Sequence, residues 1–218
     1  MKRLYIIVEG QTEQEFVRTL IATYLQQYGI FEVTPILIRT SKTGRGGFVN
    51  YQHLKNDAER LLKSGKRDFI VSMFVDFFRC PEVPHKEKWS VKNSHTEQAE
   101  IMEQCIKEDI EDARFIPYIQ LHEFEALLFA SNKGFETFFT EKQKEKTLQI
   151  INSYDNPEDI NTTPEGAPSK RIITIKDDYD KVLEGNLIAL EVGFAKIIEK
   201  CPRFKAWIER LIESCKDN

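Results

Sequence analysis

The stretch Leu4-Tyr5-Ile6-Ile7-Val8-Glu9-Gly10-Gln11-Thr12-Glu13 passes from an apolar segment into a polar turn near the start of the chain. The apolar part has the length of a buried strand, and the residues after the turn repeat apolar side chains at helical spacing. We therefore expect a strand over about 3–8 and a helix over about 13–27. Such a strand carries the carboxylate of Glu9 to its C-terminal end, where open α/β sheets form their sites.

Two later apolar runs end in the same way. Phe69–Val75 is followed by Asp76, and Phe115–Leu121 is followed by His122-Glu123-Phe124-Glu125. Parallel strands that are joined by crossover connections present their C-terminal ends at one edge of the sheet. The sequence therefore predicts that Glu9, Asp76 and the acidic segment after the third run gather at a common rim.

Strand-like and helix-like patterns alternate along the first two-thirds of the chain. Further strands are expected over about 31–38 and 114–121, and further helices over about 51–64 and 96–110. This order predicts an α/β fold with a mainly parallel sheet flanked by helices. Pro35 favours an edge position or a bulge in the second strand, because proline cannot donate to a sheet ladder.

The composition changes near Thr140. A polar helical segment comes first, then a loop rich in Asp, Asn, Thr and Pro, and then two segments with apolar residues at helical spacing. We therefore divide the chain into an α/β domain, residues 1–139, and a helical extension, residues 140–218, that packs on it.

The bulk composition is that of a folded protein. Of the 218 residues, 41% are hydrophobic and 30% are charged, and the net charge is −4. This balance excludes a generic polyanion binder, so contact with nucleic acid must depend on local basic clusters or on metal. No apolar stretch is long enough to span a bilayer or to form a signal peptide. The lack of such a segment makes a cytoplasmic location the expectation. The four cysteines have no close pair, which predicts reduced thiols.

Acidic side chains at strand ends suit a hard divalent cation. Magnesium usually takes one or two carboxylates together with substrate phosphate. Glu9 and Asp76 are therefore candidate metal ligands and catalytic residues, and Glu13, in the first turn of the next helix, is a further candidate ligand. The alternative for each acid is a turn or helix cap, or a partner of the helix dipole.

His122, Glu123 and Glu125 open a short segment that is otherwise strongly apolar. A buried helix does not carry two acids without compensation. One of the two glutamates could bind a metal ion or act as a general base, and Glu123 is the candidate metal ligand. His122 could orient that glutamate or relay a proton. The alternative is a helix N-terminus that is simply enriched in acids.

Two basic points are candidates for contact with a phosphate backbone. The loop from Arg39 to Gly47 is glycine-rich and carries Lys42 and Arg45, but it lacks the residue order of a P-loop. Lys170 and Arg171 form the second point. Each could touch phosphates, or could be a solvated basic surface.

These residues resemble the TOPRIM domain of topoisomerases, primases and overcoming-lysogenization-type nucleases, over about residues 2–128. Over nearly the whole chain the sequence looks more like a group of small bacterial TOPRIM-like proteins of unknown function. The stretches that carry this resemblance are Ile6-Ile7-Val8-Glu9-Gly10-Gln11-Thr12-Glu13, Leu121-His122-Glu123-Phe124-Glu125-Ala126-Leu127-Leu128-Phe129, Ala167-Pro168-Ser169-Lys170-Arg171 and Cys201-Pro202-Arg203-Phe204.

The resemblance implies a TOPRIM-like fold and Mg²⁺- or Mn²⁺-dependent cutting or joining of nucleic-acid phosphodiesters, with Glu9 as general acid/base or metal ligand. It also implies an ATPase partner in a bacterial defence or toxin-like setting. TOPRIM enzymes usually hold metal with an Asp-x-Asp pair, and this chain has Asp76-Phe77-Phe78 instead. Either Glu123 or Glu125 replaces the second aspartate, or catalysis has been lost.

The expected function is therefore metal-dependent hydrolysis of DNA or RNA. The alternative is a catalytically inactive TOPRIM-like scaffold that regulates an ATPase partner.

Overall fold

The computed structural model describes residues 2–40, 44, 46–63, 68–78, 80–92, 94–160 and 164–216. The chain forms two compact units, one of Met1–Leu121 with Glu209–Asn218 and the other of His122–Ile208. The boundary expected from composition, after residue 139, falls inside the second unit. Compactness does not show which segments fold independently, so the division into 1–139 and 140–218 stays a prediction.

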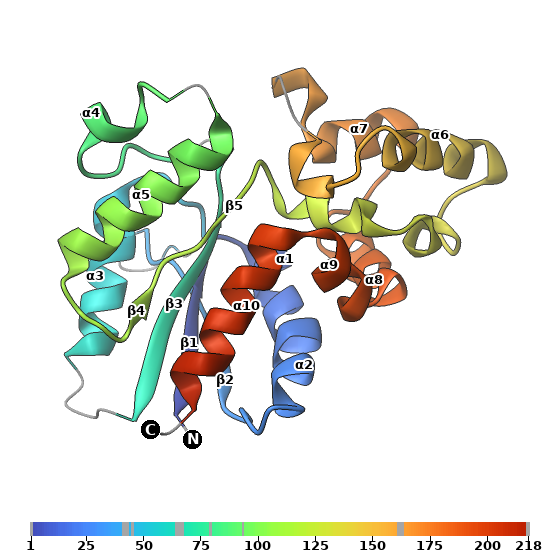
Figure 1. Ribbon diagram of the computed structural model, residues 1–218. Helices are drawn as coiled ribbons and strands as arrows, with labels where there is room; N and C mark the ends of the chain where they lie inside the picture. Colours follow the sequence, from blue (N-terminus) through green and yellow to red (C-terminus); the bar gives the residue numbers. More distant parts are fainter. Residues whose placement is uncertain are drawn as a thin grey trace. The chain divides into compact units, whose positions relative to one another are not determined.

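The first unit is built on a parallel sheet (Figure 1). The strand order is β2-β1-β3-β4, β5 also pairs with β3, and every pair is parallel. The α/β fold with a mainly parallel sheet is thus confirmed. Pro35 lies in the edge strand β2, as predicted. The strands are β1 (Arg3–Val8), β2 (Val33–Leu37), β3 (Phe69–Asp76), β4 (Phe115–Ile116) and β5 (Ile119–Gln120).

The fourth predicted strand is interrupted. The sequence predicts one strand over 114–121, whereas β4 and β5 are separated by Pro117 and Tyr118. Proline has no backbone N–H to donate to a ladder, which accounts for the break. Tyr118 is buried at the break, where its hydroxyl donates to Oε1 of Gln120 at 2.8 Å.

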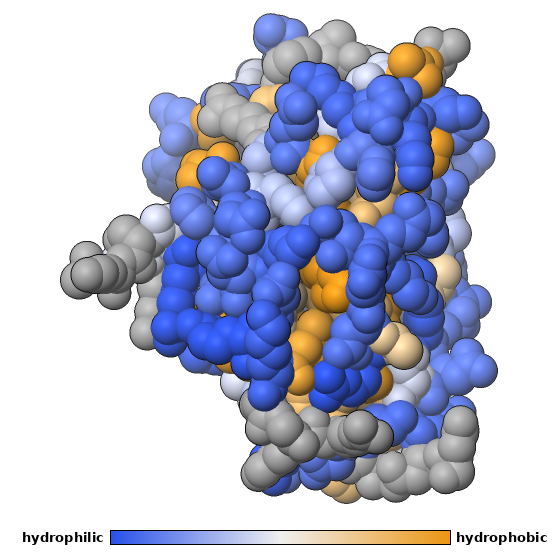
Figure 2. All heavy atoms as spheres, turned by 90° about the vertical axis from the view of Figure 1, so that its left-hand side faces the viewer, coloured by the Kyte–Doolittle hydropathy of each residue, from blue (hydrophilic) through white to orange (hydrophobic). Residues whose placement is uncertain are grey.

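Helices cover both faces of the sheet (Figure 1). Ile7 and Met73 pack with α3 and α5 on one face, whereas Phe16 of α1 meets Phe74 on the other face, 6.0 Å between ring centroids. The side of the unit on which α3, α4 and α5 lie is mostly hydrophilic (Figure 2), as expected for amphipathic covering helices. The helices are α1 (Gln11–Phe16), the π-helix η1 (Val17–Ile21), α2 (Ala22–Gln26), α3 (Tyr51–Leu62), α4 (Lys86–Trp89), α5 (His95–Ile110) and the end of α10 (Pro202–Cys215).

The second unit consists of short helices, and none of its described residues lies in a strand. Gly193, with φ of 82°, separates α8 from α9, so three helices stand where the sequence predicted two. Gly134 packs closely on α8, since a Cβ there would come 2.8 Å from Ile188 Cγ2. The elements are η2 (Phe124–Ala130), η3 (Asn132–Phe135), α6 (Glu141–Asn152), η4 (Pro157–Asp159), η5 (Pro164–Gly166), α7 (Pro168–Ile175), α8 (Leu183–Val192), α9 (Phe194–Lys200) and the start of α10.

No helix among the described residues combines the length and the apolar character needed to cross a membrane.

Two helices of this unit begin with proline and are capped by distant carboxylates. Glu158, fully buried, accepts backbone hydrogen bonds from Arg203 at 2.9 Å and Phe204 at 3.2 Å in the first turn of α10. Glu123 accepts from the backbone N–H of Ser169 at 2.9 Å, in the first turn of α7. Each carboxylate satisfies N–H groups that have no partner within their helix and interacts favourably with the helix dipole.

We expect Glu158→Gln to lower the free energy of unfolding by about 1–2 kcal/mol, because the variant loses the charge that both backbone N–H groups meet. Urea denaturation at neutral pH measures the change. Glu145→Gln, on the exposed side of α6, is the control and should change stability by less than about 0.5 kcal/mol. Equal stability of the two variants would show that the buried cap contributes nothing.

Candidate functional site

Glu9 and Asp76 lie at the same edge of the sheet. β1 and β3 are parallel neighbours with Val8 opposite Phe74, so Glu9 and Asp76 both follow at the C-terminal ends of these strands. A strand separation of about 4.8 Å and a one-residue step of about 3.3 Å place their Cα atoms about 6 Å apart. The register thus places the backbones of these two acids at one edge of the sheet, and a shared ion between their carboxylates stays a prediction.

The negative charge at this rim affects the pKa of the Cys80 thiol. Its thiol is largely shielded from water, and burial, together with the negative charges of Glu9 and Asp76, raises its pKa well above the ordinary value. A thiol held in its neutral form is a poor metal ligand.

The glycine-rich basic loop is tied to the backbone of Glu9. The N–H of Gly47 donates to the carbonyl of Glu9 at 2.8 Å, and the N–H of Gly46 donates to Ile38 at 2.8 Å. Both glycines have positive φ, 91° at Gly46 and 84° at Gly47, a conformation that other residues rarely adopt. This anchoring holds the described part of the loop beside the acidic rim. Lys42 and Arg45 lie outside the described residues.

Glu13 is buried in the first turn of α1. A Cβ on Gly10 would stand 2.9 Å from Oε2 of Glu13, so the carboxylate lies directly against the glycine that precedes the helix. The position fits a partner of the helix dipole. Asp76 follows Phe74 on the face of the sheet that α1 covers, because side chains alternate along a strand.

The donor set of the rim fits magnesium or manganese. Glu9 and Asp76 supply hard carboxylate oxygens, and Mg²⁺ commonly binds one or two carboxylates and completes its shell with phosphate and water. Phe78 stands where an Asp-x-Asp pair would place its second acid. In the part of the chain that the structure describes, no three His, Cys, Asp or Glu side chains are grouped to hold a metal ion.

His122, Glu123 and Glu125 belong to the second unit, so their convergence with Glu9 and Asp76 stays a prediction. His122 is buried and has φ of 64°, a left-handed conformation in which a residue with a side chain is strained. Glu123 caps α7, as described above, which is the structural alternative that the sequence left open for it.

Glu125 is fully buried on η2 and has an altered acidity. Burial raises the pKa of Glu125 to about 7. The positive charge of Lys181 counteracts part of this shift, and the negative charge of Glu123 adds to it. The ammonium of Lys181 lies 3.2 Å from Oε2, but neither carboxylate oxygen has a well-aligned hydrogen bond to a described residue. The hydroxyl of Tyr179 is also buried without such a partner, and burial and the charge of Glu125 raise its pKa.

Both residues of the second basic point lie in α7. Lys170 is exposed, whereas the guanidinium of Arg171 donates to the carbonyls of Gly166 at 2.7 Å and Ile160 at 3.2 Å. Arg171 therefore has a structural role within the second unit, whatever else it binds.

Sequence reasoning did not find several of these groups. Cys80, Tyr179 and Lys181 stand in no motif, and only the fold brings them beside Glu9 or Glu125. The two positive-φ glycines had a signal, because a Gly-Gly pair after a basic loop is typical of a constrained turn.

The parallel sheet and its acidic rim define an α/β protein with a candidate divalent-cation site at the C-terminal ends of its central strands. The chain belongs to the family described as Domain of unknown function (DUF4276), which matches residues 8–212. No curated protein matches the chain.

Two solved structures are similar to the chain. One is the C-terminal region of the Burkholderia pseudomallei OLD protein, with a TM-score of 0.48 and 13% identity, covering 99% of this chain and 100% of that one. The other is the C-terminal region of the Xanthomonas campestris pv. campestris OLD protein, with a TM-score of 0.42 and 14% identity, covering 99% of this chain and 94% of that one. At these values, the function has to be argued from the chain's own residues.

Proposed function

We propose that this protein hydrolyses phosphodiester bonds of nucleic acid with Mg²⁺ or Mn²⁺ bound at the acidic rim of Glu9 and Asp76. The observation that carries the proposal is the register of β1 and β3, which brings two acids from distant parts of the sequence to one edge of a parallel sheet. Sheets of this kind form their ligand sites at that edge.

Each candidate residue has a role in this proposal. Glu9 and Asp76 would hold the metal ion, which when bound supplies positive charge for a developing phosphoryl anion and lowers the pKa of water. The glycine loop tied to Glu9 would steer the phosphate backbone with its basic side chains. Glu125, with a pKa of about 7, is suited to proton transfer near neutral pH, and His122 could relay that proton.

The setting is a second part of the proposal. The TOPRIM-like proteins that the sequence resembles imply a cytoplasmic protein that works with an ATPase partner in defence or in a toxin-like system. All four cysteines are free thiols in the structure, which agrees with a reducing compartment.

A second candidate function is that of an inactive scaffold for an ATPase partner. Phe78 in place of a second aspartate favours it, as does the commitment of Glu123 to the cap of α7. In this case the sheet keeps the TOPRIM-like architecture without retaining a functional metal site.

Metal binding distinguishes the two functions. We expect calorimetry to show Mn²⁺ binding to the wild type and at least about tenfold weaker binding to Glu9→Gln, because a ligand charge is lost. Glu32→Gln is the matched control, because Glu32 lies at the N-terminal end of β2, away from the C-terminal ends of the strands. This variant should bind Mn²⁺ as the wild type does. Plasmid DNA and RNA are then incubated with each protein and Mg²⁺ or Mn²⁺, with EDTA as the blank. Absence of Glu9-dependent binding and of cleavage would reject the nuclease and support the scaffold.

A further inference from the structure

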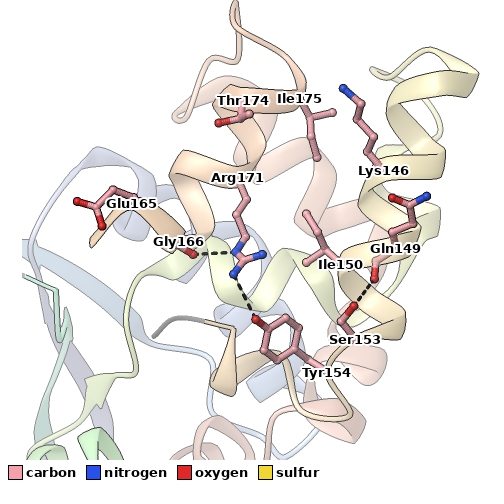
Figure 3. Close-up of a pocket in the computed structure, with 10 residues that line it drawn as sticks. All are labelled: Lys146, Gln149, Ile150, Ser153, Tyr154, Glu165, Gly166, Arg171, Thr174 and Ile175. Atoms are coloured by element: carbon pink, nitrogen blue, oxygen red, sulfur yellow. Dashed lines mark hydrogen bonds between the residues drawn. The ribbon is translucent and has the colours of Figure 1, made fainter. Parts of the chain in front are cut away.

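A pocket of about 590 Å³, broadly open to solvent and called the cavity below, lies between α6 and α7 of the second unit (Figure 3). Its volume is within the range of about 300–1,000 Å³ that is typical of small-molecule sites. The lining combines two cations and several neutral polar groups with two isoleucines, which is the composition of a site for an anion with an apolar part.

Arg171 is held rigidly at one wall of this cavity. Its Nε donates to Gly166 at 2.7 Å, and its Nη2 donates to Tyr154 Oη and to Ile160, each at 3.2 Å. The guanidinium carbon lies 5.6 Å from the centre of the Tyr154 ring. Nη1 donates to no described residue, so one arm of a fixed guanidinium remains available to a ligand. A preorganised donor loses little entropy on binding.

The opposite wall carries a second cation. Lys146 extends from α6, across the cavity from Arg171, and forms no ion pair with a described residue (Figure 3). The one acid of the lining, Glu165, points away from the guanidinium in the same view. Ile150 and Ile175 provide apolar surface between the two cations. The lining therefore contains two cationic side chains and one acidic side chain, with apolar surface between the two cations.

We propose that this cavity binds a phosphate monoester attached to a nucleoside, with the phosphate on Arg171 and Lys146. A monoester carries a charge of about −1.5 to −2 at neutral pH, which suits two cations better than a carboxylate would. Arginine forks match phosphate oxygens geometrically, and lysine adds a point charge. The nucleoside part would lie on Ile150 and Ile175. The same chemistry is offered by a free nucleoside 5′-monophosphate and by the 5′-phosphorylated end of a strand.

This site is independent of the proposed nuclease chemistry, because it uses no residue of the acidic rim. Its test therefore measures binding without divalent metal. Calorimetry compares a nucleoside 5′-monophosphate, the nucleoside without phosphate, a 5′-phosphorylated oligonucleotide and the same oligonucleotide with a 5′-hydroxyl. Glu9→Gln is included and should bind as the wild type does, so a failure of the nuclease proposal leaves this result unaffected.

The decisive variant is Lys146→Glu, on the exposed side of α6. We expect it to weaken binding of the phosphorylated ligand about tenfold, as charge reversal next to a doubly charged group should. Lys133→Glu, an exposed lysine of the same unit outside the cavity lining, is the matched control and should change binding less than about twofold. Circular dichroism checks that both variants keep their helices.

Each result of these binding measurements leads to a different conclusion about the ligand. Binding of the monophosphate supports a free nucleotide as the ligand, whereas binding of only the 5′-phosphorylated strand supports a strand end, and either supports the phosphate site. Equal binding of phosphorylated and unphosphorylated ligands, or equal effects of the two lysine variants, would overturn it. Arg171→Lys provides a second measurement, because it keeps the charge and removes the fork, and it should also weaken binding.

Discussion

On the proposed nuclease function, Asp76→Asn is expected to lower Mg²⁺-dependent cleavage of nucleic acid by about 10²–10⁴-fold, the range seen when a group that acts on the reacting phosphate or water is removed. Asparagine has almost the same shape as aspartate but carries no charge, so it cannot neutralise a divalent cation. Asp76 is the last residue of β3, and its backbone is held by the pairing with Gln120 of β5. The strand should therefore keep its position in the variant.

The matched control is Asp68→Asn. Asp68 directly precedes β3, at the N-terminal end of the same strand. Its carbonyl accepts a hydrogen bond from the backbone N–H of Arg3, and its side chain is exposed. We expect this variant to cleave as the wild type does, because the substitution is identical and only its place on the sheet differs. Initial rates over a series of Mg²⁺ concentrations measure both. Equal rates for Asp76→Asn and Asp68→Asn would remove Asp76 from the mechanism.

Much of the secondary structure of the first unit could be predicted, because the sequence patterns that indicate it are local. The run Phe69–Val75 is apolar except for Ser72 and is buried along its whole length, as a strand covered on both faces requires. The helix over 51–62 repeats its apolar residues at helical spacing. The expected proximity of Glu9 and Asp76 follows from one rule of parallel sheets, since both residues end neighbouring strands.

The second unit could not be predicted to the same extent, because its contacts connect residues far apart in sequence. Glu158 caps a helix that begins at Pro202, and Glu123 caps one that begins at Pro168. A capping side chain from the preceding residue leaves a local signal, but a cap from a remote residue does not. The prolines did carry a signal, because proline is favoured in the first turn of a helix.

These caps also explain two of the stretches that carry the resemblance to small TOPRIM-like proteins. Ala167-Pro168-Ser169 and Cys201-Pro202-Arg203 both place proline at the first helical position, with backbone N–H groups turned toward a buried carboxylate. The resemblance at these positions therefore reflects how two helices of the second unit begin. It is the stretch around Glu9, together with Asp76, that carries the chemical proposal.

Glu125→Gln is expected to stabilise the protein at alkaline pH. Burial holds the pKa of Glu125 at about 7, above its ordinary value of 4.5. The folded state therefore binds a proton that the unfolded state releases between these two values, and stability falls as the pH rises through that window. The difference between the two pKa values corresponds to about 3 kcal/mol once the carboxyl is ionised in both states. Glutamine has nearly the same shape as the protonated acid and does not carry this penalty.

The pH dependence separates this effect from a simple change of packing. We expect the stability gain of Glu125→Gln to be less than about 1 kcal/mol at pH 5 and about 3 kcal/mol at pH 8, since the wild type is penalised only where the buried carboxyl must ionise. Lys181 and Glu123, the charged neighbours that shift this pKa, are unchanged in the variant. Glu191→Gln, exposed on α8, controls for the loss of one negative charge and should show no such dependence. Urea denaturation at both pH values measures the gain, and a gain that is equal at pH 5 and pH 8 would show that Glu125 ionises as an ordinary carboxyl group.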